Sequence, residues 1–143
     1  MPAPSRIVTL LVDDDPGEVE LVRAMLEHSH MNFDLRYAQG GLECLALLRR
    51  ERPFENQPTP ALILLDLNMP GMDGLAVLEA LKQDKALRAI PVVVFTTSDR
   101  PQDVQGSYER YANCFITKPG EYREYMAVLH TIESFWSGTV KLP

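Results

Sequence analysis

Short apolar runs that stop at carboxylates are the feature that most constrains how this chain can fold. The first run, Ile7–Val12, is continuous rather than alternating, and three aspartates beginning with Asp13 follow it. A second run, Ala61–Leu65, ends at Asp66 in the same way. Continuous apolar runs of about four to eight residues are typical of strands that are buried on both faces. The sequence therefore predicts buried parallel strands whose ends carry acidic groups.

Segments with helical periodicity follow each of these runs. After the first run, Pro16 suits the first turn of a helix, and Val19, Val22, Met25 and Leu26 recur near a period of about 3.6 residues. The expected strands are Ile7–Val12, Phe33–Ala38, Ala61–Leu65, Val92–Phe95 ending at Thr96, and Cys114–Thr117. The expected helices begin near Glu18, near Leu42, near Leu75, at Pro101 and before Tyr125. The second ends near Arg52, the fourth ends at Tyr111, and the fifth runs through Trp136.

Alternation of strands and helices along the chain predicts an α/β fold. Five such units in succession favour a doubly wound, five-stranded parallel sheet with helices on both faces, because crossovers between parallel strands are right-handed. The common strand order is 2-1-3-4-5, and ligands then bind at the carboxyl ends of the strands, where the order reverses. The 143 residues fit one domain, so we expect a single domain over residues 1–143.

Charge and cysteine content narrow the class of protein. With 14 basic and 20 acidic residues the formal net charge is −6, which argues against a nucleic-acid partner. The two cysteines form no Cys-x-x-Cys motif, and a reduced setting is the simpler interpretation. Cys44 lies among the leucines of an expected helix, and Cys114 is expected in a buried strand. Neither an apolar leader in Met1–Arg6 nor an apolar run of about 18 residues is present. We expect a cytoplasmic protein with no membrane partner.

Side chains capable of chemistry follow four of the five expected strands. They are Asp13 and Asp14, Asp66, Thr96 and Lys118. Strands one and three are expected to be neighbours, about 4.8 Å apart, so their carboxylates converge at one rim of the sheet. Clustered carboxylates repel one another unless a cation neutralises them. Hard oxygen ligands with room for water and a phosphate oxygen suit Mg²⁺, so the rim is a candidate magnesium site.

The same rim has the groups that phosphoryl transfer requires. An aspartate beside Mg²⁺ can act as a nucleophile toward phosphorus and form an acyl phosphate. The protein then mainly positions groups that neutralise the equatorial oxygens. Mg²⁺ can cover one oxygen, the Lys118 ammonium a second, and the Thr96 hydroxyl with backbone amides a third. The residues therefore describe a phosphoaspartate site as well as a metal site.

Four motifs resemble the signatures of response regulator receiver domains, the family of the chemotaxis regulators. They are Val12–Pro16, Leu64–Gly74, Phe95–Ser98 and Phe115–Pro119, and they occur in order over essentially the whole chain. The resemblance implies a receiver domain of a two-component system. It implies that Asp66 accepts a phosphoryl group from a phosphohistidine on a sensor histidine kinase.

The resemblance also implies roles for individual residues. The magnesium ligands would be three carboxylates and one main-chain carbonyl, those of Asp13, Asp14, Asp66 and Asn68. Thr96 would be the switch hydroxyl and Phe115 the switch aromatic, so that phosphorylation alters the surface from strand four to helix five. Asn68 and Ser98 occupy positions that tune the rate of dephosphorylation in this family.

A finer resemblance lies in the flanking segments. Pro53–Pro60, Ala112–Pro119, Ile132–Trp136 and Val140–Pro143 look like segments of the single-domain regulators paired with bacterial and cyanobacterial phytochromes. This resemblance implies a phytochrome-type kinase and no output domain. It also implies a homodimer formed through helix four, strand five, helix five and the C-terminal segment.

Structural interpretations compete with these roles at several positions. Asp13 and Asp14 could simply cap helix one, a task for which one acidic residue suffices, and Asp15 is the better candidate for that cap. Asp73, before Gly74, is expected to serve the turn rather than a metal. Phe115 is either a switch aromatic or plain core. Phe135 and Trp136 belong either to the core face of helix five or to a dimer contact.

Two other functions fit parts of the pattern. A Mg²⁺-dependent aspartyl-phosphate phosphatase also has an Asp nucleophile and a Lys, but it typically has a general acid–base Asp two residues after the nucleophile. Here that residue is Asn68, which cannot transfer a proton in that way. A flavin-binding module would need a hydroxyl- and glycine-rich phosphate loop where this chain has three aspartates. The sequence therefore favours a phosphoacceptor over a turnover enzyme.

Overall fold

A parallel sheet forms the centre of the protein, for which a computed structural model describes residues 6–28 and 33–143. The strands in this part of the chain are β1 (Ile7–Val12), β2 (Phe33–Ala38), β3 (Leu62–Leu65), β4 (Val92–Thr96) and β5 (Cys114–Thr117). They form one sheet in the order β2-β1-β3-β4-β5, and every neighbouring pair is parallel. The predicted fold class and strand order are confirmed.

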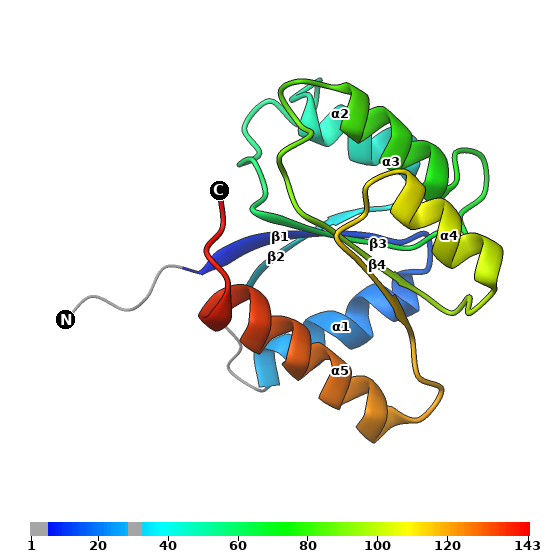
Figure 1. Cartoon of the computed structure of the whole chain (residues 1–143). Helices are drawn as coiled ribbons and strands as arrows, with labels where there is room; N and C mark the ends of the chain where they lie inside the picture. The colour runs from blue at the N-terminus through cyan, green and yellow to red at the C-terminus, as the bar shows by residue number, and fades with distance from the viewer. Residues whose placement is uncertain (1–5, 29–32) are drawn as a thin grey trace.

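Helices cover both faces of the sheet (Figure 1). The helices of the first face are α1 (Pro16–His28) and α5 (Tyr122–Ser134). Those of the second face are α2 (Gly41–Leu48), α3 (Gly74–Gln83) and α4 (Pro101–Glu109). None of the helices in the described residues is long and apolar enough to cross a membrane.

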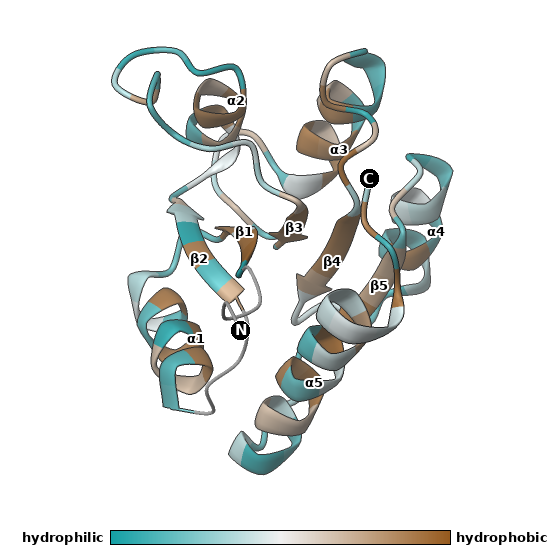
Figure 2. Cartoon of the chain, turned by 90° about the vertical axis from the view of Figure 1, so that its left-hand side faces the viewer, coloured by the Kyte–Doolittle hydropathy of each residue, from teal (hydrophilic) through white to brown (hydrophobic). Residues whose placement is uncertain are grey.

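Alternation along the strands divides the core into two parts. Successive strand residues point to opposite faces, so Val94 packs toward α2–α4 whereas Val93 and Phe95 pack toward α1 and α5. The core on the α2–α4 side is almost wholly aliphatic, whereas the α1/α5 side also contains Phe33, Phe95 and Tyr125. In Figure 2 the apolar β3 and β4 lie between helices whose outer sides are hydrophilic.

Two helices end earlier than the sequence pattern indicates. α2 ends at Leu48 rather than near Arg52, because Arg50 adopts a left-handed conformation with φ 55°. α4 ends at Glu109 rather than Tyr111, because Tyr111 has φ 65°. A left-handed residue just past the last turn is a common way to end a helix, although glycine usually supplies it. Periodicity alone could not locate these ends, because a single left-handed residue ends each helix and the apolar pattern does not indicate that conformation.

The C-terminal segment differs most from the predicted helix. α5 ends at Ser134, and Trp136 lies in a π-helical turn over Phe135–Thr139. Trp136 packs against the α1/α5 core, whereas Phe135 is 46% exposed and contacts the indole edge-on, with ring centroids 5.3 Å apart. The chain then returns to the amino ends of β3 and β4, where Pro143 lines a hollow with Pro60 and Pro91.

Strand β5 is less buried than expected. Within the described part of the chain it is an edge strand, so one side of its backbone has no neighbouring strand there, and Cys114, Phe115 and Ile116 are half-buried. Cys114 was expected in a buried strand, and that expectation is wrong, because its side chain is only half-buried. On the open side, the backbone N–H of Phe115 donates a hydrogen bond to the Tyr108 hydroxyl of α4 at 3.2 Å.

Candidate functional site

Strand register brings the first and third strand ends together. The backbone N–H of Asp66 donates to the carbonyl of Val12 at 3.0 Å, and that of Asp13 donates to the carbonyl of Ala38 at 3.1 Å. Both aspartates thus extend the sheet by one residue, on adjacent strands. Asp13 is 2% and Asp66 is 8% exposed, so each carboxylate has lost most of its water.

Three carboxylates gather at this rim. Asp13, Asp14 and Asp66 each offer an oxygen, and these oxygens all lie within 4.8 Å of one another. Carboxylates this close repel strongly unless positive charge lies between them. Their hard oxygens, together with a partly open side at the half-buried Asp14, suit a divalent cation that keeps some of its waters. The donor set therefore fits the metal that the sequence predicts.

Lys118 supplies positive charge beside the carboxylates. Its side chain is 6% exposed, and its Nζ lies 2.9 Å from Asp13 Oδ2 and 3.0 Å from Glu18 Oε1. The Nζ also lies 5.4 Å from the centroid of the Phe95 ring, within range of a cation–π contact. Burial disfavours the charged ammonium, but Asp13, Asp66 and Glu18 outweigh that effect and raise the pKa of Lys118. The lysine is therefore a permanent cation of the site.

The surroundings of Asp66 shift the pKa of its carboxyl group. Burial raises the pKa of Asp66, the Lys118 charge and a hydrogen bond with Thr96 lower it, and the charge of Asp13 raises it again. The rise is the net result, so ionised Asp66 is less stable here than in water. Such a carboxylate gains from any cation that joins the cluster.

Thr96 and Asn68 lie beside Asp66 on the same rim. Thr96 is fully buried, and its Oγ1 accepts hydrogen bonds at 3.4 Å from Asn68 Nδ2 and from the Ser98 backbone N–H. The Asn68 backbone N–H lies 3.4 Å from Asp66 Oδ1. The structure thus brings together Asp13, Asp14, Asp66, Asn68, Thr96 and Lys118. Phe115 lies apart from them, half-buried against the α2–α4 core beside Val94.

Two neighbouring aspartates serve as helix caps. Asp15 Oδ1 accepts a hydrogen bond from the backbone N–H of Gly17 at 2.9 Å, at the start of α1. Asp73 Oδ1 accepts one from the backbone N–H of Ala76 at 2.9 Å, at the start of α3. The predictions that these two residues serve local structure are confirmed. Asp13 is therefore free of the capping task.

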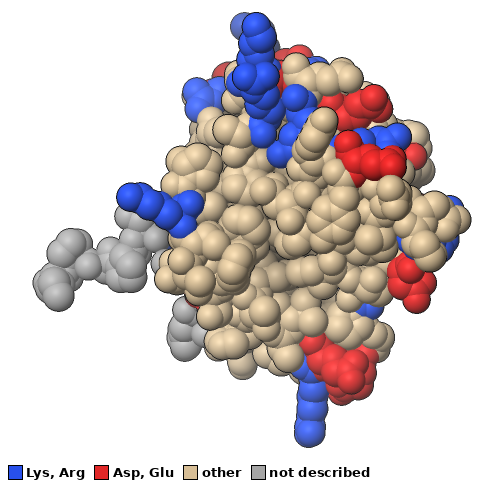
Figure 3. Space-filling view, viewed as in Figure 1, with Lys and Arg blue, Asp and Glu red and all other residues tan. Residues whose placement is uncertain are grey.

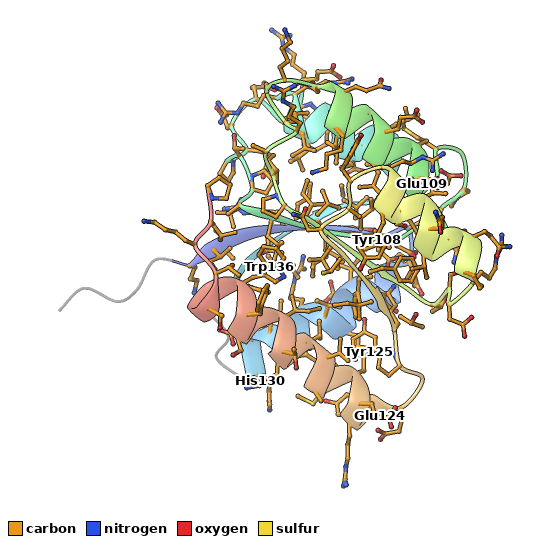
Figure 4. All side chains as sticks on the ribbon, in the orientation of Figure 1. Tyr108, Glu109, Glu124, Tyr125, His130 and Trp136 are labelled. Carbon is orange, nitrogen blue, oxygen red and sulfur yellow. The ribbon has the colours of Figure 1, made fainter. Side chains whose placement is uncertain are left out.

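Two residues of the site were missed by the sequence analysis. Glu18 was interpreted only as the start of a helix, and Tyr125 only as a residue of the last helix. In the structure the Tyr125 hydroxyl donates to Glu18 Oε1, which also contacts Lys118. Burial, and then Glu18 itself, raises the pKa of Tyr125, so the hydroxyl keeps its proton. Figure 4 shows Tyr125 on the side of α5 toward the sheet, with Glu124 on the outer side.

A signal for these two residues exists but is incomplete. Tyr125 recurs with Leu129 and Ile132 on one helical face, and a buried tyrosine needs a partner for its hydroxyl. The identity of that partner depends on how α5 lies against α1, which no periodicity specifies.

Comparisons with known proteins agree with this geometry. The family described as response regulator receiver domain matches residues 9–130. The response regulator Rcp1 of Synechocystis sp. is 43% identical over 136 residues, covering 95% of this chain and 92% of Rcp1. The protein PilH of Pseudomonas aeruginosa is 32% identical, covering 86% of this chain and 94% of PilH.

Solved structures are similar over nearly the whole chain. The phosphorylated cyanobacterial phytochrome response regulator RcpA superposes with a TM-score of 0.91 and is 37% identical, covering 97% of this chain and 99% of RcpA. The Mn²⁺-bound form of Rcp1 has a TM-score of 0.89 at 43% identity, covering 96% of this chain and 99% of Rcp1. Fold, sequence motifs and full-length similarity agree, and this chain belongs to the response regulator receiver domain family.

Proposed function

We propose that this protein is a response regulator whose Asp66 accepts a phosphoryl group from a sensor histidine kinase in a Mg²⁺-dependent reaction. The observation that carries the proposal is the convergence of Asp13, Asp14 and Asp66 within 4.8 Å, with Lys118 in contact with Asp13. A nucleophilic carboxylate, a cation site and a fixed ammonium are the groups that phosphoryl transfer to an aspartate needs.

Each residue has a defined part in this proposal. The carboxylates of Asp13, Asp14 and Asp66, with the main-chain carbonyl of Asn68, would hold Mg²⁺, which when bound neutralises one phosphoryl oxygen. One Asp66 oxygen attacks phosphorus while the phosphorus–nitrogen bond to the kinase histidine breaks, and the imidazole keeps that electron pair. Lys118 neutralises a second oxygen. The Thr96 hydroxyl donates to the third.

The phosphorylated state would be read from the surface between β4 and α5. Movement of the buried Thr96 hydroxyl toward the phosphoryl group opens space near Phe115, whose half-buried ring borders the surface. A phytochrome-type kinase is the proposed partner. Similarity to RcpA, a phytochrome response regulator by its name, and to the bacteriophytochrome response regulator AtBRR supports this choice.

Labelling tests the phosphoacceptor directly. Purified protein would be incubated with Mg²⁺ and acetyl phosphate, and phosphoprotein would be separated on a phosphate-affinity gel. We expect label on the wild type and on Asp73→Asn, a matched control in which an amide can still cap α3. Asp66→Asn, or removal of Mg²⁺ with EDTA, should abolish it. An unlabelled wild type, or an Asp66→Asn variant that keeps its label, would overturn the proposal.

A homodimer is the second part of the proposal. Figure 3 shows a broad area without charged side chains over the face that includes β5 and α5. Two large aromatic residues, Tyr108 and Phe135, are 48% and 46% exposed. Charge depletion together with aromatic residues is typical of the core of an interface.

Light scattering after size-exclusion chromatography tests this assembly. Phe135→Asp should turn dimers into monomers, because a carboxylate in the interface would lose its water without a partner. Leu42→Asp is the control, because Leu42 is 75% exposed on α2, on the other side of the sheet. A wild type that runs as a monomer, or equal effects of the two variants, would contradict the dimer.

A further inference from the structure

Lys118 contacts two carboxylates in the described structure, and they differ in what else they do. Asp13 approaches Nζ at 2.9 Å through Oδ2, while its Oδ1 accepts from the backbone N–H of Asp15 at 2.9 Å. In the proposed function Asp13 must also hold a divalent cation. An oxygen shared with a dication attracts an ammonium less, and the dication itself repels it. Asp13 therefore becomes a weaker partner for Lys118 once the metal binds.

Glu18 is not one of the proposed metal ligands. Its Oε1 lies 3.0 Å from Lys118 Nζ, and its side chain is 19% exposed. It lies in the first turn of α1, outside the cluster formed by Asp13, Asp14 and Asp66. It can keep its contact with the ammonium whatever occupies that cluster.

Tyr125 fixes Glu18 in this orientation. The tyrosine hydroxyl donates to the same Oε1 that contacts Lys118, and the ring is 6% exposed. The ring also meets Phe95 edge-on, with centroids 5.4 Å apart, and Phe95 underlies Lys118. Lys118, Glu18, Tyr125 and Phe95 thus form a closed circuit of contacts. A long, flexible glutamate held from behind by a buried hydroxyl is preorganised to hold the ammonium.

We propose that Glu18, oriented by Tyr125, is the positioning residue that keeps Lys118 at the phosphorylation site when Asp13 binds the metal. This inference rests on the proposed function of Asp66 and deepens it. Neither residue touches the phosphoryl group, and both act through Lys118. The circuit also joins α5, on the proposed output surface, to the reacting site through one hydroxyl group.

Removal of single atoms tests the circuit. Tyr125→Phe deletes the hydroxyl and keeps the ring against Phe95, and Glu18→Gln deletes the charge at nearly constant size. Tyr122→Phe is the matched control, because Tyr122 is 57% exposed on the same helix. At saturating Mg²⁺ we expect each of the first two variants to lower the rate of Asp66 labelling by acetyl phosphate about fivefold. The double variant should be no slower than the slower single one.

A second measurement needs no phosphoryl transfer. A buried, ion-paired ammonium exchanges its protons slowly, so Lys118 Nζ should give a ¹H–¹⁵N signal, assigned by its loss in Lys118→Arg. Mg²⁺ alone should leave this signal in wild type and in Tyr122→Phe. It should broaden the signal in Tyr125→Phe and Glu18→Gln, where Lys118 loses its fixed partner. Signals that respond to Mg²⁺ as in wild type in these two variants, or labelling defects that add in the double variant, would overturn the inference.

The two readouts separate this inference from the proposed function. If wild type takes no label at Asp66, the proposed function fails, and the ammonium signal still decides whether Glu18 holds Lys118. If wild type is labelled while the variants match it in both readouts, the positioning role alone fails.

Discussion

The two faces of the sheet contact the candidate site in different ways. On the α1/α5 face, a chain of charged and hydrogen-bonded groups runs from Tyr125 through Glu18 to Lys118. On the α2–α4 face the core is aliphatic, and it meets the rim through close backbone packing at Gly74 and through the Thr96 hydroxyl. Charged groups dominate the contact of one face with the site, and close packing dominates that of the other.

This difference determines what each face can tolerate. A charge contact acts over several ångströms and adapts to small shifts, whereas backbone packing fails within a few tenths of an ångström. Matched pairs of residues, one on each face, can therefore break or sharpen the comparison.

Substitution of the glycines at the helix starts should show the largest difference in stability between the two faces. A Cβ at Gly74 would lie 2.4 Å from the Asp66 carbonyl oxygen and 2.7 Å from Leu67 Cα, both backbone atoms. We expect Gly74→Ala to lower the free energy of unfolding by about 3 kcal/mol and to slow Asp66 labelling. At Gly17, in the first turn of α1, the nearest contact is the Asp15 side chain at 3.3 Å. Gly17→Ala should change stability by less than about 1 kcal/mol.

Urea unfolding monitored by circular dichroism measures both losses. Equal losses in the two variants would mean that both faces meet the rim by the same kind of packing, and the distinction would be wrong.

The fold was predictable because its signals are local. Continuous apolar runs such as Ile7–Val12 and helical periodicity between them yield the strands, and right-handed crossovers then leave few possible orders. The candidate site followed from the fold, because the carboxyl ends of parallel strands share one rim. Asp13, Asp66 and Lys118 could thus be placed together although more than 100 residues separate Asp13 from Lys118.

The rest depended on contacts that a linear pattern does not encode. Glu18 and Tyr125 meet because α1 and α5 lie on the same face of the sheet, so their partnership needs the tertiary structure. The ends of α2 and α4 depend on single left-handed residues, Arg50 and Tyr111, which have no special propensity for that conformation. Cys114 was expected in a buried strand, but β5 is an edge strand.

Cysteines on the two faces should show the next largest contrast, in alkaline solution. Burial raises the pKa of Cys44, on the α2–α4 face, from 9.0 to about 12. The unfolded chain loses this proton above pH 9 while the folded chain keeps it. The stabilisation is therefore complete below pH 9 and disappears as pH rises toward 12, by about 1.4 kcal/mol per pH unit.

Urea unfolding at pH 8 and pH 10.5 tests this effect. Wild type should lose about 2 kcal/mol more than Cys44→Ala between these two pH values. The matched variant is Cys114→Ala, because Cys114 is half-buried against the α1/α5 core and burial raises its pKa less. It should keep most of the wild-type loss. The same pH dependence in wild type and in Cys44→Ala would show that this thiol does not stay protonated in the fold.

Removal of the aspartate caps should show the smallest difference in stability between the two faces. The acidic cluster determines which variant loses more. Asp73 caps α3 on the α2–α4 face and Asp15 caps α1 on the other. Removal of a cap costs about 1 kcal/mol, which is the loss expected for Asp73→Ala. Asp15→Ala should cost less in metal-free buffer, because it also removes a negative charge beside Asp13 and Asp14.

Mg²⁺ should remove this difference in stability loss between Asp15→Ala and Asp73→Ala. Once a divalent cation neutralises the cluster, the charge of Asp15 no longer opposes folding, and the loss from Asp15→Ala should rise toward that from Asp73→Ala. Urea midpoints of both variants, with Mg²⁺ and with EDTA, measure the change. If the two losses are equal in EDTA, or do not converge with Mg²⁺, the repulsion at the rim is too weak to bias folding. Charge would then couple the α1/α5 face to the site only through Lys118 and its partners.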